Sequence, residues 1–469
     1  MKKILSIIIS LLLVVLALAS CADGMHESTM TDETSSAASN ELLFETAKPL
    51  PERAESKPDI FADIDFDGAE FTFGIIDSVY YEDYNEVTGM DENSQDAISR
   101  AVMLRNSIIE ELYNCKIKTI VENSYSHPAP SLAEMKSVDI SIKKYSFASC
   151  ANGWYYNAMN VVDASAPWWR EFFIEDMEIN GKLYGLIGNF SVNAFESAYA
   201  VFYDKELVKN KDLYSLVKDG EWTADTLLEL ARSAKRDFAK GSVTDMNGIS
   251  ALYFGAGGEI LQKYDGEDEN DRFVQALNET SSFAAQAIAE MFASENFSVA
   301  EKISNVDSAF FCIALEDAQA LTEAGINIGV LPMPAYSKEQ IDTHGYISTV
   351  RNDFAYIVFP KMSDCDISVL GKFADIYAYY SSLYVYPTYV KGKVSEIGGT
   401  QDDEMMIDHI LKNVRFDWGF VKGVSAVKNT LFAGIAEGKN TVPELAAEKG
   451  EALSEAGELL ITSIKECGG

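Results

Sequence analysis

The pattern of apolar positions changes period twice near the start of the folded part of the chain. Apolar and polar residues alternate over 70–76, which predicts a strand. Over 96–112 the apolar residues recur at helical spacing, and 116–121 returns to strand-like alternation. A strand, helix, strand order favours a parallel α/β sheet.

Further short strands and then a long run of helices follow. Thr223 is placed to cap a helix that runs to about residue 238, because its side chain can accept a bond from the first helical turn. Apolar strands are predicted at 197–203, 327–331 and 354–359. After residue 366 helical patterns dominate, at 366–384, 402–415, 425–437 and 443–466. The prediction is a mixed α/β protein with a helical C-terminal part.

The first twenty residues have the pattern of an export signal. Lys2 and Lys3 precede an uncharged run that ends at Ala19, and this run is short for a membrane span. The segment Leu18-Ala19-Ser20-Cys21 resembles the lipobox of bacterial lipoproteins. The resemblance implies that residues 1–20 are removed and that Cys21 carries a lipid anchor outside the cytoplasm.

The composition of residues 21–59 predicts a flexible tether. The segment is rich in Ser, Thr, Glu and Ala, contains Pro49, Pro51 and Pro58, and shows no apolar periodicity. Such a tether would hold a folded body some distance from the membrane surface.

Length and charge narrow the range of functions. With 469 residues and 47% apolar composition, the chain is long enough for two lobes with sizeable cores. Its 38 Lys and Arg against 73 Asp and Glu give a net charge of −35, which argues against nucleic acid as a partner. The four histidines are scattered and no CxxC pair occurs, so we expect no metal and no cofactor.

Three segments occur in an order typical of one protein family. They are Ile179-Asn180-Gly181-Lys182-Leu183-Tyr184-Gly185, Tyr203-Asp204-Lys205-Glu206-Leu207-Val208 and Glu221-Trp222-Thr223. In this order they resemble the signature of extracellular solute-binding proteins of ABC importers. Further segments, 328–334 and 386–389, resemble its sugar-binding branch, family 1. The similarity spans about 61–443.

The resemblance implies a two-lobed, periplasmic-binding-protein-like clamp of type II. On the family's pattern, residues 60–195 plus 340–375 form one lobe, and residues 196–339 plus 376–469 form the other. Such a protein is a monomer that catalyses no reaction. It captures a small solute, here a carbohydrate, and delivers it to an ABC permease in the membrane. The family's calcium-like loop is reduced here to 241–249, so no bound metal is expected.

Aromatic side chains are the first candidates for ligand contact, because sugars present apolar C–H faces to flat rings. Trp168 and Trp169 lie in a loop that the family places near the hinge, where packing between lobes is the alternative role. Trp418 lies where the family often delivers an aromatic residue to the cleft. Tyr253 precedes a glycine-rich run, 255–258, that allows close backbone approach at a cleft lip.

Three polar residues complete the candidate ligand site. Arg351 follows a strand-like segment and can fork to a hydroxyl or carboxylate, with an ion pair as the alternative. Asp77 and Ser78 follow the first strand, at the end of the sheet where α/β proteins bind ligands. A solvated turn is the alternative for this pair.

Two other functions stay open from the sequence. A surface glycoside hydrolase needs only two carboxylates, although neither a Ser nucleophile elbow nor an HExxH motif occurs here to support other hydrolytic chemistry. A lipid-anchored adhesin or peptide-binding lipoprotein would use its aromatics at a protein interface. A deep aromatic cleft favours solute binding, and a carboxylate pair about 5 to 10 Å apart across it favours hydrolysis.

Overall fold

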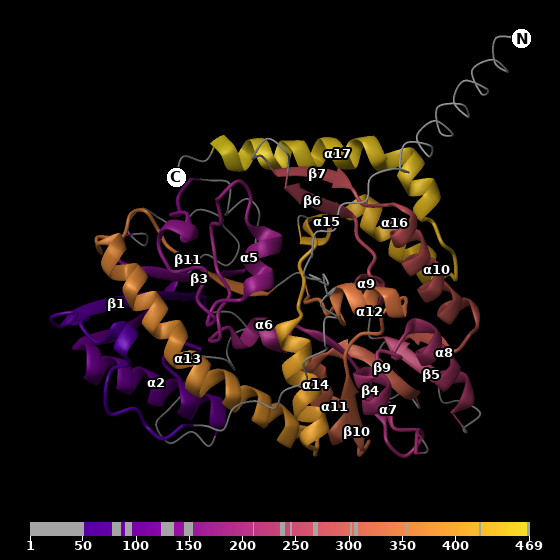
Figure 1. Cartoon of the computed structure of the whole chain (residues 1–469), viewed down its shortest axis with the longest axis horizontal. Helices are drawn as coiled ribbons and strands as arrows, with labels where there is room; N and C mark the ends of the chain where they lie inside the picture. Colours follow the sequence, from indigo (N-terminus) through magenta and orange to yellow (C-terminus); the bar gives the residue numbers. More distant parts are fainter. Residues whose placement is uncertain are drawn as a thin grey trace, which may run out of the picture. The chain divides into compact units, whose positions relative to one another are not determined.

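The computed structural model (Figure 1) describes residues 51–76, 86–89, 96–122, 136–144, 153–209, 211–234, 240–243, 246–265, 271–300, 303, 308–351, 354–421 and 424–466. These residues belong to one compact unit, residues 40–469. The predicted signal peptide, Cys21, most of the predicted tether, Asp77 and Ser78 lie outside the described residues.

The first sheet has four strands in the order β11-β3-β1-β2. Its strands are β1 (Ala69–Ile76), β2 (Cys115–Glu122), β3 (Ile140–Lys144) and β11 (Ala355–Val358). β1 pairs in parallel with both β2 and β3, whereas β11 runs antiparallel to β3. The predicted strand, helix, strand unit with parallel pairing is therefore confirmed.

Helix α2 (Ala97–Tyr113) connects β1 to β2 and begins and ends as its sequence dictates. The Asp96 carboxylate caps the first turn by accepting from the backbone N–H groups of Ile98 and Ser99. Asn114 ends the helix in the left-handed conformation, with φ at 52°.

β3 lies between two other strands although its sequence is polar at one end. Lys143 has only 8% of its surface exposed. Strands buried in an all-parallel sheet are usually apolar throughout. β3 departs from this pattern, because one of its two neighbours is the antiparallel strand β11.

The second sheet has five strands in the order β10-β4-β9-β5-β8. Its strands are β4 (Tyr199–Asp204), β5 (Lys240–Val243), β8 (Phe297–Val299), β9 (Ser308–Ala314) and β10 (Ile328–Leu331). β4 runs antiparallel to both neighbours, and β9, β5 and β8 are mutually parallel. All residues of β9 are buried, so this strand forms the centre of the second core.

Helices lie before, between and after the strands of the second sheet in the chain. Thr223 caps α8 as predicted, by accepting from the N–H of Thr226. The helices from α5 to α12 are α5 (Glu171–Met177), α6 (Val192–Glu196), α7 (Leu213–Lys218), α8 (Ala224–Ser233), α9 (Met246–Gly255), α10 (Glu279–Ala293), α11 (Ala318–Glu323) and α12 (Lys338–His344). Short 3-10 helices are η1 (Asp59–Phe61), η2 (Ala158–Asn160) and η4 (Leu315–Asp317).

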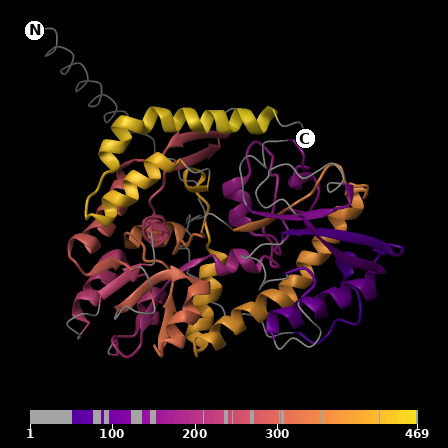
Figure 2. The same ribbon diagram turned by 180° about the vertical axis from the view of Figure 1, so that it is seen from behind.

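The C-terminal part is helical, as predicted. It contains α13 (Ile367–Glu396), α14 (Gln401–Lys412), α15 (Trp418–Val421), α16 (Ser425–Ala436) and α17 (Val442–Glu466). α13 lies beside α2, and α17 runs along the hairpin formed by β6 (Leu261–Asp265) and β7 (Asp271–Gln275), as Figures 1 and 2 show.

The predicted end of α13 at residue 384 is wrong, because the helix continues through Pro387 to Glu396. A proline inside a helix removes one backbone bond and costs about 3 kcal/mol. Here the flanking Tyr384, Tyr386 and Tyr389 are all buried, and their burial offsets that cost. The predicted lobe boundary after residue 375 also falls within this helix, and the lobe boundaries stay a prediction.

Three neighbouring segments connect the parts of the chain that hold the two sheets. The Tyr199 N–H donates to the Thr349 carbonyl at 2.9 Å, and the Arg351 N–H donates to the Ser197 carbonyl at 3.0 Å. The third segment joins them because the Arg415 N–H donates to the Ser348 carbonyl at 2.8 Å. These backbone bonds hold 197–199, 348–351 and 413–415 side by side.

Candidate functional site

A cavity of about 750 Å³ lies where α5 meets segments that surround the second sheet. Its lining comes from the end of α5, the stretch 254–263, the start of α10, the stretch 336–349, and residues 415–418. α5 precedes the first connecting segment, whereas the stretch 254–263 and α10 come after it. This volume falls within the range of sites that bury a small molecule.

Flat apolar side chains cover part of the cavity wall. Phe283 and Tyr336 are stacked, with ring centroids 5.6 Å apart and planes at 3°. Phe283 keeps 44% of its surface exposed, which is high for a large apolar side chain. The other aromatic lining residues are Phe254, Phe416 and Trp418. The pair of aligned rings offers an exposed flat surface to a solute.

Trp418 lines the cavity with only a small part of its ring. Its Nε1 donates to the backbone carbonyl of Asp176 at 2.6 Å, and its ring packs against Phe273 with centroids 5.8 Å apart. Only 4% of its surface is exposed. Trp418 therefore fixes the end of α5 in place as well as lining the cavity.

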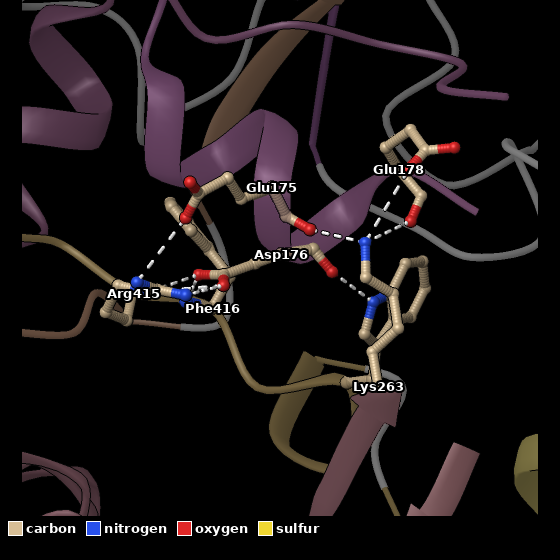
Figure 3. A network of polar contacts seen from close by, with 7 residues as sticks. Glu175, Asp176, Glu178, Lys263, Arg415 and Phe416 are labelled. Carbon is tan, nitrogen blue, oxygen red and sulfur yellow. Dashed lines mark hydrogen bonds and ion pairs between the residues drawn. The ribbon is translucent and has the colours of Figure 1, made fainter. Parts of the chain in front are cut away.

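An ion pair joins α5 to the segment 415–418 (Figure 3). Arg415 Nε lies 3.1 and 3.0 Å from the two carboxylate oxygens of Asp176, and the Phe416 N–H donates to the same carboxylate at 2.8 Å. Burial raises the pKa of Asp176, and the adjacent Arg415 guanidinium opposes that rise. The carboxylate has few acceptor positions left for a solute.

Lys263 joins the hairpin β6–β7 to the same helix (Figure 3). Its Nζ donates to the backbone carbonyls of Glu175 and Glu178, at 2.8 Å for Glu178. The Glu178 carboxylate lies 3.6 Å from the same nitrogen. The last carbonyls of a helix lack partners within it, so a lysine there satisfies them and complements the helix dipole.

Glu259 reaches the cavity from the loop between α9 and β6. Its backbone is well held: the N–H donates to Ser281 Oγ at 3.0 Å, and the carbonyl accepts from the Tyr253 hydroxyl at 2.7 Å. Among the described residues, none makes a hydrogen bond or ion pair with the Glu259 carboxyl. Burial, and next the charges of Asp417 and Asp176, raise the pKa of Glu259 to about 7, while Arg415 opposes the rise.

The two predicted tryptophans of the 166–170 loop lie away from this cavity. Trp168 and Trp169 both donate their Nε1 to Asp375 Oδ1, at 3.1 and 2.9 Å. Both are buried, with 9% and 3% of their surface exposed. The Asp375 carboxylate in α13 therefore anchors this loop, and a ligand role for the two rings stays a prediction.

The remaining predicted residues are split between the cavity and other places. Trp418 lines the cavity, whereas Tyr253 is fully buried behind it and its neighbour Phe254 reaches the lining. Arg351 forms an ion pair with Glu316 and does not line the cavity. Their ligand roles also stay predictions, and Asp77, Ser78 and Cys21 lie outside the described residues.

Most of the lining residues were not predicted from the sequence. Phe283 and Tyr336 come from segments more than fifty residues apart, and their stacking has no sequence signal. Glu259 directly follows the glycine-rich run 255–258. A polar residue at the end of such a run is the sequence feature that could have identified it as a lining residue. Arg415 stands just before Phe416 and Asp417, but its partner Asp176 is in another part of the chain.

Comparison with known proteins gives the fold. No protein-family model matches the chain, and no curated protein matches it either. The solved structure of the sugar-binding protein MalE from Xanthomonas citri aligns with a TM-score of 0.51, covering 84% of this chain and 98% of that one at 10% identity. The fold is that of the periplasmic substrate-binding proteins. The predicted two-lobed α/β fold is confirmed.

Two further structures of this fold align at lower scores. The cyclic alpha-maltosyl-1,6-maltose binding protein from Arthrobacter globiformis has a TM-score of 0.47 and 12% identity, over 85% of this chain and 99% of that one. A cyclo/maltodextrin-binding protein complexed with maltotetraose has a TM-score of 0.49 and 10% identity, over 85% of this chain and 97% of that one. Both are described as binding proteins.

The described residues contain neither a membrane-spanning helix nor a metal-binding cluster. None of their helices combines the length and the apolar character needed to cross a membrane. Nor do they contain a group of three or more His, Cys, Asp or Glu side chains placed to hold a metal ion. The cavity beside α5 is the candidate site.

Proposed function

We propose that the chain is an extracytoplasmic binding protein that takes a small carbohydrate into the cavity beside α5. In this proposal the two lobes close on the sugar, and the closed form delivers it unchanged to an ABC permease. The lipid on Cys21 and the tether 21–59 would keep the protein near that permease. The observation that carries the proposal is the cavity itself, with its stacked rings and polar lining.

The lining suits the chemistry of a sugar. A pyranose ring has a face of C–H groups that packs on a flat aromatic ring, and the exposed Phe283–Tyr336 pair offers such a surface. Its rim of hydroxyls needs side chains that both donate and accept, and Gln262, Asn278 and Thr280 are such lining residues.

The position of α5 supports a binding event coupled to closure. Lobe closure changes affinity only if the solute is held by groups that the motion brings together. Glu175 and Asp176 reach the cavity from α5, and the rings that line it belong to the other contributing segments. A solute in the cavity would therefore touch both groups of elements at once.

The likeness to MalE supports the fold only, because the identity is 10%. That protein is described as sugar-binding, and we propose the same class of solute here on the strength of the cavity lining.

The proposal is tested by screening the purified full chain against mono- and oligosaccharides, amino acids and peptides. A solute at 100 times its dissociation constant adds about 2.7 kcal/mol to the free energy of unfolding, which raises the thermal midpoint by about 2 to 4 °C. We expect such a rise with a sugar, which is then recovered intact from the complex.

Matched variants locate the binding site in the cavity. Phe283→Ala removes one exposed ring of the stacked pair, and we expect it to weaken sugar binding about tenfold. Tyr264→Ala removes an equally exposed ring (47%) that does not line the cavity, and we expect less than about a twofold change in the dissociation constant. Equal losses from both variants would contradict the assignment of the cavity.

A glycoside hydrolase is the second candidate, because one observation favours it. The pKa of Glu259 is raised to about 7 with Asp417 and Asp176 nearby, which is a property of general acids in glycosidases. Recovery of a cleaved sugar, and loss of cleavage in Glu259→Gln, would replace the binding proposal with this one. A thermal midpoint that no sugar moves but a peptide raises would favour the peptide-binding lipoprotein.

A further inference from the structure

The charges that line the cavity are unbalanced. Among the described residues that line it, five carry a carboxyl group and two, Lys263 and Arg415, carry a permanent positive charge. The carboxylates are those of Glu175, Asp176, Glu259, Glu339 and Asp417. The protein as a whole has a net charge of −35, so its field adds to the local excess of negative charge.

Both cations already have protein partners. Arg415 contacts the Asp176 carboxylate through Nε and the Glu175 carboxylate through Nη1 at 3.6 Å. Lys263 contacts two helix carbonyls and the Glu178 carboxylate. An anionic solute would have to compete with these contacts inside an acidic cavity, which makes its binding unfavourable.

The carboxylates differ in what neutralises them. Asp176 has Arg415 as its counter-ion. Asp417 accepts from the backbone N–H groups of Ile260 and Leu261, at 3.1 and 3.3 Å. Glu339 is exposed on α12, where water screens its charge. Glu259 is mostly withdrawn from water, and the described residues provide its carboxyl with no donor.

The groups around Glu259 explain why its ionised form is costly. Asp417 and Asp176 bring negative charge, Arg415 is the positive charge that acts on it, and Lys428 on α16 lies near Asp417. A carboxylate in such surroundings gains most from a cation placed beside it, because burial has removed the water that would otherwise solvate it.

From this juxtaposition we infer that the cavity takes a sugar carrying a protonated amine, with Glu259 as the counter-ion of that amine. The inference rests on the proposed carbohydrate-binding function and names its solute class: basic amino sugars ahead of neutral sugars, and acidic sugars last. The stacked Phe283–Tyr336 pair packs on the C–H face of the ring, and Glu259 selects by charge.

The test uses four β-1,4-linked trimers that share one ring skeleton: those of glucose, glucosamine, N-acetylglucosamine and glucuronate. Their binding to the purified full chain is measured by calorimetry near neutral pH. We expect the glucosamine trimer to bind roughly tenfold to a hundredfold more tightly than the glucose trimer, the range for a hydrogen bond to a charged group. The N-acetylated trimer should lose this advantage, and the glucuronate trimer should bind most weakly.

Substitution assigns the selectivity to one carboxyl. Glu259→Gln keeps the size of the side chain and removes its charge, so we expect it to abolish the advantage of the glucosamine trimer over the glucose trimer. Glu323→Gln removes one charge from an exposed position on α11 outside the cavity, and should leave the preference intact. An equal effect of both variants would overturn the assignment to Glu259.

The result also separates this inference from the function on which it rests. If neutral trimers bind as tightly as the glucosamine trimer, the inference is overturned and the carbohydrate-binding proposal stands. If no trimer of this series and no other sugar binds, both are overturned. Thermal midpoints of the two variants, measured without sugar, confirm that each is folded.

Discussion

At the scale of single residues, two carboxyl groups with raised pKa values have different surroundings. Glu259 faces the cavity, whereas Glu86 lies inside the packing between α2, α6 and α13. The Glu86 carboxylate accepts from the backbone N–H of Asn193, and its carbonyl accepts from Arg105 and Tyr377. Burial raises the pKa of Glu86 to about 8, with the Asn193 bond and the charge of Arg105 opposing the rise. The Glu86 carboxyl therefore contributes to packing, and its raised pKa should make the free energy of unfolding depend on pH.

The Glu86 carboxyl predicts a loss of stability with rising pH. Its pKa is about 8 in the folded protein against an ordinary value of 4.5, so the folded state binds the proton more tightly than the unfolded chain. The stabilisation that this proton adds to the free energy of unfolding is complete below about pH 4.5 and is lost as the pH rises to about 8.

Denaturant unfolding at a series of pH values checks this expectation. In Glu86→Gln the free energy of unfolding should fall less steeply over this interval than in the unsubstituted protein. The exposed Glu323→Gln variant should keep the original slope. Parallel pH profiles for all three proteins would contradict the protonated state of Glu86.

At the scale of elements, α13 lies so close to the preceding chain that one position tolerates no side chain. A Cβ at Gly371 would lie 1.8 Å from the backbone carbonyl oxygen of Val161. On the same helix, a Cβ at Gly392 would meet nothing within 4 Å. The two glycines thus have opposite roles: one permits a close approach, and the other only lowers helix propensity.

Substituting these two glycines should change stability in opposite directions. Gly371→Ala forces the backbone of α13 or of the Val161 segment to move, and we expect a loss of at least about 1 to 3 kcal/mol in the free energy of unfolding. Gly392→Ala should add about 0.5 to 1 kcal/mol, because alanine is the better helix former. Chemical denaturation of both variants checks the pair, and a loss in Gly392→Ala comparable to that in Gly371→Ala would refute the packing argument.

Elements with a clear period were predictable from the sequence, and others were not. The apolar pattern changes period twice between β1 and β2, over residues 69–122, so the type of β1, α2 and β2 and the parallel pairing of the two strands followed from it. β9 is apolar at nearly every position, because it is central in its sheet and buried on both faces, and such a run has no period to detect. α13 continues past its predicted end at residue 384 because tertiary packing overrides the preference of Pro387 for a helix end.

At the scale of the whole molecule, the cavity depends on contacts between segments far apart in the chain. The sequence located Trp418 in the lining because the family resemblance covers that region. It did not locate Phe283, Tyr336 or Glu259, because each enters the cavity only through the packing of other elements. The resemblance indicated the fold, and the lining followed only from the folded chain.

Lys263 predicts how tightly the hairpin β6–β7 is held to the end of α5. Its ammonium joins the hairpin β6–β7 to the end of α5, and Lys263→Met removes the donor but keeps the aliphatic chain. Losing hydrogen bonds to a charged group costs about 1.5 to 3 kcal/mol, so we expect sugar affinity to fall by a factor of roughly 10 to 100, mainly through faster release.

The matched control is Lys209→Met, which removes an exposed ammonium that pairs with Glu206, three residues earlier in the turn after β4. Stopped-flow release of the bound sugar should be unchanged in this variant. Equal release rates in the Lys263→Met variant and the unsubstituted protein would show that the hairpin does not hold α5.

The pairing of β11 with β3 also decides the order in which the two cores can be completed during synthesis. Ala355 pairs with Lys144, and all five strands of the second sheet lie between these two residues in the chain. The second sheet is therefore whole on the emerging polypeptide while the first still lacks its edge strand. A chain cut off before residue 355 would keep all the strands of one sheet and leave the other open along β3, the strand edge from which aggregation between neighbouring chains begins.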